Sequence, residues 1–289
     1  MRRSPFASIG AGVALALLLT ACKSAGVTPN APLPQKLFAA NCGNNIVTEY
    51  APPYTGTPTI LSNAMDCPVG VALNASGDLF VANWSNSHVT EYAPPYTGAP
   101  IATISTDVNV PFSLAFDSSG DLFVANSGSS TVTEYAPPYT GAPIATTSTD
   151  LDSPQGLAFN SAGDLFVGNL SNNTVTEYAP PYTGAPIATI STEEPWALVF
   201  NSSGDLFVAN TGNDTVTEYA SPYTGAPIAT ISTDVTNPEG LALTSSGSLF
   251  VSNENNSTVT EYAPPYTGAP TTTISTDLGP TLEGLAISK

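Results

Sequence analysis

Residues 111–148 read PFSLAFDSSGDLFVANSGSSTVTEYAPPYTGAPIATTS and contain four short runs rich in Val, Ile, Phe, Tyr and Thr. Runs of this composition and length predict β-strands, and no helical spacing of apolar residues competes with them. Gly120 can adopt the left-handed conformation that closes a hairpin, whereas the prolines of residues 136–143 exclude ladder pairing and predict a loop. The predicted strands are residues 111–116, 121–126, 131–135 and 144–148.

The same unit recurs along the chain. The string Val-Thr-Glu-Tyr occurs six times at spacings of 41 to 43 residues, with its acidic residue at Glu49, Glu91, Glu134, Glu177, Glu218 and Glu261. A fixed period near 40 residues with four strands per unit is typical of a β-propeller blade. The sequence therefore predicts an all-β, six-bladed β-propeller with four antiparallel strands per blade.

Both ends of the repeat region are incomplete. The region begins with a second strand at residues 37–41 and ends with an isolated first strand at residues 282–288. If this last strand becomes the innermost strand of the blade built from residues 37–62, six complete blades form and no open sheet edge remains. We therefore predict a 3+1 closure, in which three N-terminal strands join one C-terminal strand.

Composition limits the classes of function. The 289-residue chain is 42% hydrophobic and 10% charged, which excludes a disordered chain, a coiled coil and a multi-span membrane protein. Five Lys and Arg residues face 23 Asp and Glu residues, so the formal net charge is −18. Nucleic acid binding is excluded because too few cations are present to neutralise phosphates.

The N-terminus has the pattern of an export signal. Arg2 and Arg3 precede an apolar run at residues 11–19 that is too short to span a membrane. The run leads into Leu19-Thr20-Ala21-Cys22, which resembles the lipobox of bacterial lipoproteins. This resemblance implies cleavage before Cys22 and attachment of a lipid to its sulfur. An ordinary secretory signal with an incidental Cys is the alternative.

We therefore expect a signal peptide at residues 1–21, a lipidated Cys22 with a Pro-rich tether over residues 22–35, and the propeller at residues 36–289. After cleavage the chain keeps three Lys and no Arg, for a formal net charge of −20. The lipoprotein resemblance associates an Asp after the Cys with retention in the inner membrane. Because Lys23 occupies that position, anchoring at the outer membrane or cell surface is favoured.

One copy of the repeat resembles a known family. Residues 154–160 (PQGLAFN), followed by residues 163–169 (GDLFVGN) and residues 173–175 (NTV), resemble an NHL repeat. The likeness extends over residues 36–289 and implies a propeller, but members of the family include both binding scaffolds and enzymes. Virginiamycin-B-lyase-like and lactonase-like propellers are the neighbouring enzyme families. The chain lacks the basic and His residues usual before the third strand, so the RNA binding of some NHL domains is not expected.

The copies differ at the start of the innermost strand, where side chains should face the shared axis. These positions are Val69, Phe112, Gln155, Trp196, Glu239 and Glu283. Glu239 and Glu283 are neighbours in ring order, and Glu254 falls on the same mouth of the channel. Carboxylates placed this closely repel each other, raise a pKa or bind a cation. These seven residues form the candidate ligand-binding site, and a solvated rim without function is the alternative.

An Asn ends the second strand of every copy, at Asn41, Asn83, Asn126, Asn169, Asn210 and Asn253. We expect these side chains near the same mouth. There they either hydrogen-bond the connecting turn or present amide oxygens to a hard cation. The candidate metal ligands are Glu239, Glu283, Asn210 and Asn253. The sequence requires no cofactor, and Ca²⁺ or another divalent cation is the candidate.

Positions that agree in all six copies are expected to serve packing. All 12 Tyr residues fall in two repeat positions, where their rings can pack between blades, and a Tyr-Pro belt that grips a glycan or peptide is the alternative. His88 is the only His and is expected to be a surface substitution. Chemistry that needs paired His ligands or a Ser-His-Asp triad is therefore unsupported, and no catalytic residue is assigned.

Two further cysteines accompany Cys22. Oxidation is favoured in an exported protein, and Cys42 and Cys67 should lie at the same mouth of adjacent blades. We predict a disulfide between them, with two free thiols as the alternative. Closing a loop of about 26 residues contributes roughly 3.5 kcal/mol in the chain-entropy description.

These features favour a lipid-anchored, non-catalytic binding or scaffold module for a protein, peptide or glycan, expected to be a monomer. A metal-dependent hydrolase or lyase with its site at the channel mouth is one alternative. An envelope structural protein without a discrete ligand, kept soluble by its acidic charge, is another. Whether the chain is an enzyme stays open at this stage.

Overall fold

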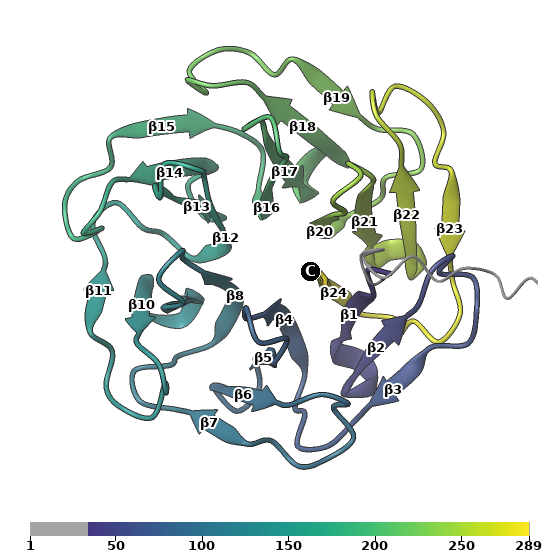
Figure 1. Cartoon of the computed structure of the whole chain (residues 1–289). Coiled ribbons are helices and arrows are strands. Elements are labelled where there is room, and N and C mark those ends of the chain that lie inside the picture. Colours follow the sequence, from purple (N-terminus) through teal and green to yellow (C-terminus); the bar gives the residue numbers. More distant parts are fainter. Residues whose placement is uncertain (1–33, 289) are drawn as a thin grey trace, which may run out of the picture. The chain divides into compact units, whose positions relative to one another are not determined.

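The computed structural model describes residues 34–288, which form six four-stranded sheets around a central axis (Figure 1). Each sheet is one blade, and its neighbouring strands are antiparallel. The prediction of an all-β, six-bladed propeller with four antiparallel strands per blade is confirmed. Blades 1 to 6 are numbered here by the chain order of their second strands.

Every blade runs outward from an innermost strand to an outermost one. The innermost strands are β24 (Leu282–Ile287), β4 (Pro68–Leu73), β8 (Pro111–Phe116), β12 (Pro154–Phe159), β16 (Pro195–Phe200) and β20 (Pro238–Leu243). The second strands are β1 (Leu37–Asn41), β5 (Leu79–Asn83), β9 (Leu122–Asn126), β13 (Leu165–Asn169), β17 (Leu206–Asn210) and β21 (Leu249–Asn253). The third strands are β2 (Ile46–Tyr50), β6 (His88–Tyr92), β10 (Thr131–Tyr135), β14 (Thr174–Tyr178), β18 (Thr215–Tyr219) and β22 (Thr258–Tyr262).

The outermost strands are short, and four second strands continue into a single 3₁₀ turn. The outermost strands are β3 (Thr59–Leu61), β7 (Ala102–Ile104), β11 (Ala145–Thr147), β15 (Ala188–Ser191), β19 (Ala229–Ile231) and β23 (Thr272–Ile274). The 3₁₀ turns are η1 (Cys42–Asn44), η2 (Ser127–Ser129), η3 (Thr211–Asn213) and η4 (Glu254–Asn256).

Strand β24 closes the ring. It is the innermost strand of the sheet ordered β24-β1-β2-β3, where Leu37 pairs with Ile287 and Phe38 pairs with Ala286. The predicted 3+1 closure is therefore confirmed. The closure pairs the inner edge of β1, which would otherwise be a free sheet edge.

Gln35 also belongs to this closure, although the sequence analysis placed it in the tether. Its amide nitrogen donates to the Ser288 carbonyl at 2.9 Å, and its side-chain oxygen accepts from the Ser245 N–H at 2.8 Å. The Tyr54 hydroxyl donates to the Gln35 carbonyl at 3.0 Å. The predicted boundary after residue 35 is thus at least one residue too late, because the polar groups of Gln35 are satisfied by the seam of the ring.

The expected signal peptide at residues 1–21, the lipidation site Cys22 and the tether up to residue 33 lie outside the described residues. Within residues 34–288, no helix has the length and apolar character needed to cross a membrane.

Aromatic rings fill the space between neighbouring blades. Phe80 of blade 2 stands edge-on to Tyr139 of blade 3, with ring centroids 5.1 Å apart, and the Tyr139 hydroxyl donates to the Gly120 carbonyl at 2.8 Å. At the other repeated position, the Tyr135 hydroxyl donates to the Thr106 carbonyl of the preceding blade at 2.7 Å. Edge-to-face packing with a satisfied hydroxyl is the favoured state of a buried Tyr. Both repeated Tyr positions are therefore buried packing positions.

The Asn residues that end the second strands are buried and join consecutive blades. In blade 2, Asn83 Nδ2 donates to the Val81 carbonyl at 3.1 Å and to Thr90 Oγ1 at 2.9 Å. Asn83 Oδ1 accepts from the Asp66 N–H at 3.0 Å, in the segment that enters the blade. Both the nitrogen and the oxygen of this amide therefore make hydrogen bonds, and the oxygen bonds the segment that connects the two blades.

The amides of two candidate metal ligands are used in the same way. Asn210 Oδ1 accepts from Thr192 Oγ1, and Asn253 Oδ1 accepts from the Thr236 N–H. Asn210 and Asn253 are almost completely buried. Both oxygens therefore make the hydrogen bond to the connecting segment that was one of the two roles expected for them, and the alternative role as metal ligands stays a prediction.

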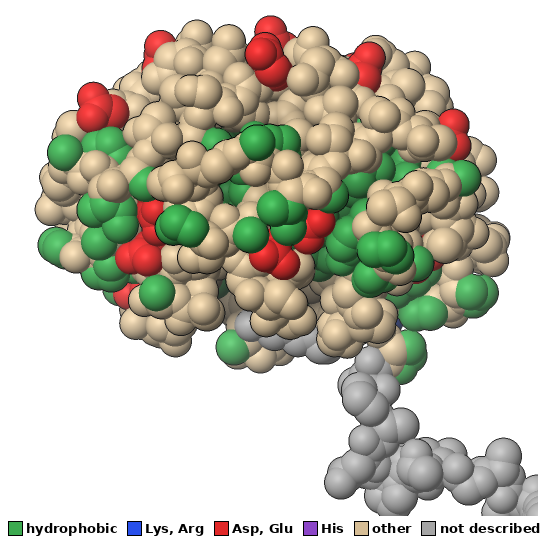
Figure 2. Space-filling model, turned by 90° about the horizontal axis from the view of Figure 1, so that it is seen from above, with side chains coloured by type: hydrophobic (Ala, Val, Ile, Leu, Met, Phe, Trp, Pro, Cys, Tyr) green, Lys and Arg blue, Asp and Glu red, His purple; other side chains and the backbone are tan. Residues whose placement is uncertain are grey.

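Acidic side chains are scattered over the outside of the propeller (Figure 2). Lys36 is the only Lys or Arg among residues 34–288, and its ammonium pairs with Glu49. The excess of acidic residues therefore gives this surface a negative potential, which disfavours anionic partners.

Candidate functional site

The innermost strands stack their side chains in three tiers along the axis. The first tier is Val69, Phe112, Gln155, Trp196, Glu239 and Glu283. The second tier is Gly70, Ser113, Gly156, Ala197, Gly240 and Gly284. The third tier is Val71, Leu114, Leu157, Leu198, Leu241 and Leu285. The second tier is uniformly small, with Ser113 as its one polar side chain, and the third is uniformly aliphatic, so the blades differ most at the first tier.

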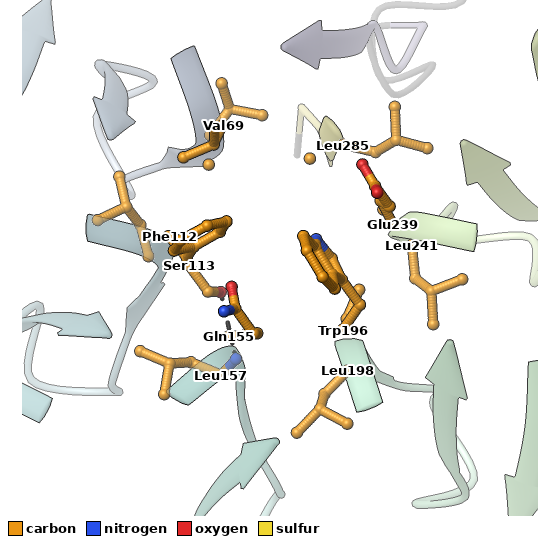
Figure 3. A pocket seen from close by; sticks show the side chains of 16 residues that line it. Val69, Phe112, Ser113, Gln155, Leu157, Trp196, Leu198, Glu239, Leu241 and Leu285 are labelled. Carbon is orange, nitrogen blue, oxygen red and sulfur yellow. Dashed lines mark hydrogen bonds between the residues drawn. The ribbon is translucent and has the colours of Figure 1, made fainter. Parts of the chain in front are cut away.

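Five first-tier residues line one cavity on the axis, which we call the channel cavity (Figure 3). They are Val69, Phe112, Gln155, Trp196 and Glu239, and the aliphatic third tier lies behind them. The cavity volume is about 100 Å³. This space holds several waters or a small head group, whereas pockets that enclose drug-sized molecules measure roughly 300–1,000 Å³.

Two aromatic rings meet across the cavity. Phe112 of blade 3 and Trp196 of blade 5 are edge-to-face, with ring centroids 5.7 Å apart and an interplanar angle of 88°. The two strands that carry them, β8 and β16, are separated by β12 in ring order (Figure 1). Since neither blade could supply this contact alone, the pair exists only because the ring is closed and narrow.

The narrow axis depends on glycines in the second tier. A side chain at Gly240 would meet the Glu283 carbonyl at 2.5 Å, and one at Gly284 would meet the Val69 carbonyl at the same distance. Inner strands can therefore approach this closely only without a Cβ at these positions. This approach brings the side chains of Glu239 and Glu283 together.

Glu239 and Glu283 form a buried carboxyl pair. Each is only 7% exposed, and the two carboxyl groups lie close enough to shift each other's pKa, so one of them carries a proton at neutral pH. Burial, with the negative charges of Glu283 and Glu254, raises the pKa of Glu239. Burial also raises the pKa of Glu283, opposed by hydrogen bonds from Glu239 and Trp196. Two carboxyls in one dry site therefore keep a shared proton near neutral pH.

Apart from the proton that the carboxyl pair carries, three buried acceptor oxygens around the cavity find no donor within the described residues. They are Gln155 Oε1, Glu239 Oε2 and Glu283 Oε2. Gln155 is 3% exposed, and its Nε2 donates weakly to Ser127 Oγ and Ser153 Oγ at 3.3 and 3.4 Å, while its oxygen is unpaired. Buried acceptors left unpaired cost free energy, so this cavity is matched to something that donates hydrogen bonds.

Glu254 lies beside the pair but does not line the cavity. Asn237 Nδ2 donates to Glu239 Oε1 at 2.9 Å and to Glu254 Oε2 at 3.0 Å, so one amide links the two acidic groups. The sequence analysis did not single out Asn237. Its position directly before Pro238, two residues from Glu239, was the only available signal.

The structure thus brings most of the predicted ligand site together. Val69, Phe112, Gln155, Trp196 and Glu239 line the channel cavity, Glu283 is buried against Glu239 and Trp196, and Glu254 is connected through Asn237. Asn210 and Asn253 are held elsewhere by their own hydrogen bonds.

Cys42 and Cys67 form a disulfide in the structure. Cys42 opens η1 directly after β1, and Cys67 directly precedes β4. The bond therefore links blade 1, whose strands come from both ends of the chain, to blade 2. Such a crosslink limits the separation of the two blades in the unfolded chain.

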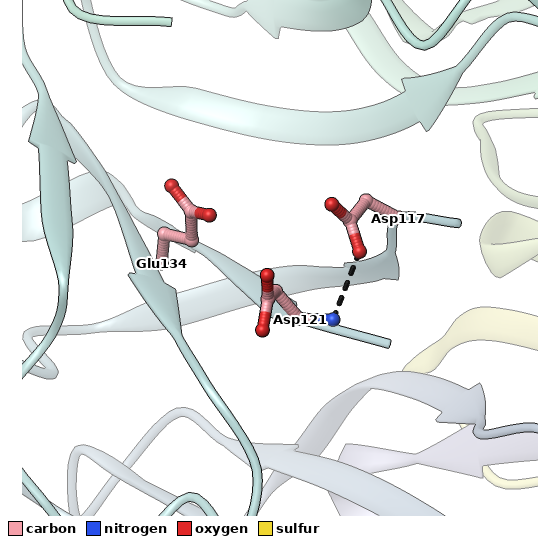
Figure 4. A group of neighbouring side chains, drawn as sticks. All are labelled: Asp117, Asp121 and Glu134. Atoms are coloured by element: carbon pink, nitrogen blue, oxygen red, sulfur yellow. Dashed lines mark hydrogen bonds between the residues drawn. The ribbon is translucent and has the colours of Figure 1, made fainter. Parts of the chain in front are cut away.

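A second acidic cluster lies in blade 3, and the sequence analysis missed it. Asp117, Asp121 and Glu134 offer carboxylate oxygens that all lie within 4.8 Å of one another (Figure 4). All three are half-buried, and Asp117 Oδ1 accepts from the Asp121 N–H at 2.9 Å. Burial and the neighbouring carboxylates raise the pKa of Asp121 and of Glu134.

A comparison between blades could have revealed this cluster. At the position of Asp117, blades 2, 4 and 5 have an Asn whose Nδ2 donates to the following Asp at 2.9 to 3.0 Å. Blade 3 replaces that donor with a third acidic group. The signal in the sequence is one Asp among Asn residues at a repeated position.

Comparison with known proteins supports the repeat assignment. Residues 65–92 match the family model described as NHL repeat. The matched segment includes β4, β5 and β6. No curated protein matches the chain.

Solved structures share the fold at low sequence identity. A protein of unknown function from Bacteroides caccae is 14% identical with a TM-score of 0.69, covering 89% of this chain and 99% of its own. A chain of a nidogen/laminin complex is 15% identical with a TM-score of 0.70, covering 88% and 98%. Virginiamycin B lyase from Staphylococcus aureus is 10% identical with a TM-score of 0.58, covering 79% and 85%. At these identities the similarity shows the propeller fold alone.

Proposed function

We propose that this chain is an exported lipoprotein whose NHL-like propeller acts as a non-catalytic binding module for a protein, peptide or glycan at the cell envelope. The channel cavity carries the proposal, because it is the place where otherwise uniform blades present different chemistry and unpaired acceptors. A binding site needs such asymmetry, whereas a purely structural ring would not.

The lining of the cavity agrees better with binding than with catalysis. It combines two aromatic side chains, aliphatic groups, a Gln and a Glu. Rigid aromatic and aliphatic surfaces with a few oriented polar groups are typical of recognition sites. One relative of the fold comes from a nidogen/laminin complex, which agrees with a propeller used in protein binding.

Binding is tested with the mature protein on peptide and glycan arrays, comparing Trp196→Ala with Trp84→Ala. Trp84 follows β5 and is 42% exposed, so it controls for the loss of a Trp outside the cavity. We expect bound spots to weaken at least about tenfold in Trp196→Ala and to persist in Trp84→Ala. Binding that is equal in all three proteins would contradict a site at the channel mouth, and no bound spot would favour a structural protein without a discrete ligand.

Anchoring is tested separately by fractionation of cells that express the full chain. We expect the wild type in the membrane fraction and Cys22→Ser in the soluble fraction of the envelope. Retention of Cys22→Ser in the membrane would contradict a lipid anchor at this residue.

A metal-dependent hydrolase or lyase is the second candidate, and the buried pair of Glu239 and Glu283 is the observation that favours it. Virginiamycin B lyase shares the fold, although at 10% identity. Hydrolysis of lactones or cleavage of virginiamycin B, assayed with Ca²⁺ or Mg²⁺, would support this candidate only if turnover is lost in Glu239→Gln.

A further inference from the structure

We propose that the channel cavity binds a small organic ammonium ion: a primary amine on an apolar stem, whose N–H groups meet the carboxyls of Glu239 and Glu283 while its stem lies against Phe112 and Trp196. The inference rests on the proposed binding function and names the chemistry of its ligand.

The first argument is the match between donors and acceptors. The buried side-chain atoms left unpaired on the innermost strands are all acceptors: Gln155 Oε1, Glu239 Oε2 and Glu283 Oε2. A protonated primary amine offers three donors and no acceptor. Such a ligand would take the place of the proton that the two carboxyls share, and it would provide the positive charge that the site lacks.

The second argument is the division of the cavity wall. The carboxyls come from Glu239 on β20 and Glu283 on β24, which are adjacent strands in the ring. Strands β4, β8 and β16 contribute Val69, Phe112 and Trp196, which line the cavity together with Glu239 (Figure 3). An ammonium group is attracted by carboxylates and by aromatic faces, and an alkyl stem gains from apolar burial. The volume of about 100 Å³ admits such a group and excludes a large ligand.

The third argument separates an ammonium ion from a metal ion. In proteins, Ca²⁺ binds about six to eight oxygen ligands. The first tier offers the oxygens of Glu239, Glu283 and Gln155 only, and the amides of Asn210 and Asn253 are occupied. A wall that is poor in oxygen and rich in aromatic carbon suits a monovalent organic cation better than a hard divalent one.

The titratable groups around the site are few. On β20 and β24 they are Glu239 and Glu283, and η4 adds Glu254. The facing strands β4, β8, β12 and β16 contribute Val69, Phe112, Gln155 and Trp196 at this level, none of which titrates. Glu194, directly before β16, is exposed and contacts Thr211. Affinity for an amine should therefore rise from pH 5 to pH 8 as the pair loses one of its protons and gains negative charge, while the amine stays charged up to about pH 10.

The chain supplies its own optical probe. It contains two Trp residues, so Trp84→Phe leaves Trp196 as the sole Trp, at the wall of the cavity. The full-length mature protein with this substitution is titrated with n-butylammonium chloride, and Trp196 fluorescence is followed. Butan-1-ol and sodium butyrate at equal concentration and ionic strength are the matched neutral and anionic probes. We expect a saturable change with n-butylammonium and none with either control.

Substitutions then locate the binding. In the Trp84→Phe background, Glu239→Gln and Glu283→Gln should each weaken n-butylammonium binding about tenfold or more, since each removes a charge-assisted hydrogen bond. Glu177→Gln changes a carboxyl on β14, away from the channel, and should bind as the parent does. Should a Glu variant misfold, the rise in affinity of the parent between pH 5 and pH 8 gives an independent test.

A second amine probe distinguishes a free amine from a Lys side chain as the source of the ammonium group. If N-acetyl-lysine N-methylamide binds as well as n-butylammonium, a Lys side chain of a peptide is the source; if only n-butylammonium binds, the source is a free amine. A response to butan-1-ol equal to that of the amine would overturn the inference. So would a response to Ca²⁺ alone, or no response to any amine at pH 8. The array experiment measures whether Trp196→Ala weakens the binding of a peptide or glycan. It can therefore support the proposed function even when the titration shows no amine binding.

Discussion

The carboxyls of the channel and those of blade 3 are two clusters of similar composition in different surroundings. Glu239 and Glu283 are enclosed by aromatic and aliphatic side chains, and each leaves one oxygen without a donor. Asp117 and Asp121 are half-buried near a hairpin turn, where a backbone N–H already meets Asp117. The difference teaches that enclosure, and not proximity alone, turns a carboxyl pair into a site that holds a proton or requires a cation.

The largest expected effect is on the pH dependence of stability in Glu239→Gln. An unfolded Glu ionises near a pKa of about 4.3, whereas burial raises the pKa of Glu239 in the folded state. Between these values the folded protein binds more protons than the unfolded one, so the wild type loses stability as pH rises. The variant lacks this loss, and it should be more stable at pH 8 by on the order of 2 kcal/mol, with no gain near pH 4.

This result is measured by urea denaturation from pH 4 to pH 8. Glu194→Gln is the control, because it removes an exposed carboxyl near the same mouth. A gain that is equal at pH 4 and pH 8 would show that the pair is not protonated by burial, and the contrast between the two clusters would fail.

The second prediction concerns the introduction of the Asp of blade 3 at the matching position of blade 4. In blade 4, Asn160 Nδ2 donates to Asp164 Oδ2 at 2.9 Å. Asn160→Asp replaces that donor with a like charge, and it should destabilise the protein by about 1–2 kcal/mol at pH 7 after allowance for solvent screening. Urea denaturation at pH 7 measures the loss. An unchanged midpoint at pH 7 would mean that the bond contributes nothing.

The reverse substitution should have a smaller effect of opposite sign. Asp117→Asn supplies blade 3 with the donor to Asp121 that blades 2, 4 and 5 possess, and it removes one of three neighbouring charges. We expect a gain of about 0.5–1 kcal/mol at pH 7. Thermal and urea midpoints check it. Destabilisation would indicate that Asp117 has a stabilising partner in solution, such as a cation.

The smallest expected effect is that of salt. Raising NaCl from 50 to 500 mM shortens the Debye length to a few ångströms, so it should reduce the Asp117→Asn gain by a few tenths of a kcal/mol. The Glu239→Gln gain should hardly change, because a buried pair is screened much less. Equal salt sensitivity of the two gains, measured from the urea midpoints, would argue against the enclosure of Glu239.

Much of the site could be predicted by comparing the six copies of the repeat. Aligning six copies identifies the first position of the innermost strand as variable, and this singles out Trp196, Glu239 and Glu283. The same comparison left two roles open for Asn210 and Asn253, because it gives the position of a residue in a blade and not the partner of its side chain. It also passed over Asp117, where an Asn-to-Asp difference changes a hydrogen bond but hardly changes the hydropathy pattern.

The sequence by itself determined the strands, the number of blades and the 3+1 closure, since these follow from period, turn chemistry and the need to pair every sheet edge. Only the tertiary structure decided that Phe112 meets Trp196, that Glu239 and Glu283 are buried near each other and that the Asn amides hydrogen-bond the connecting segments. These contacts join different blades. Their distances depend on how closely the inner strands pack around the axis, and no local pattern encodes that spacing.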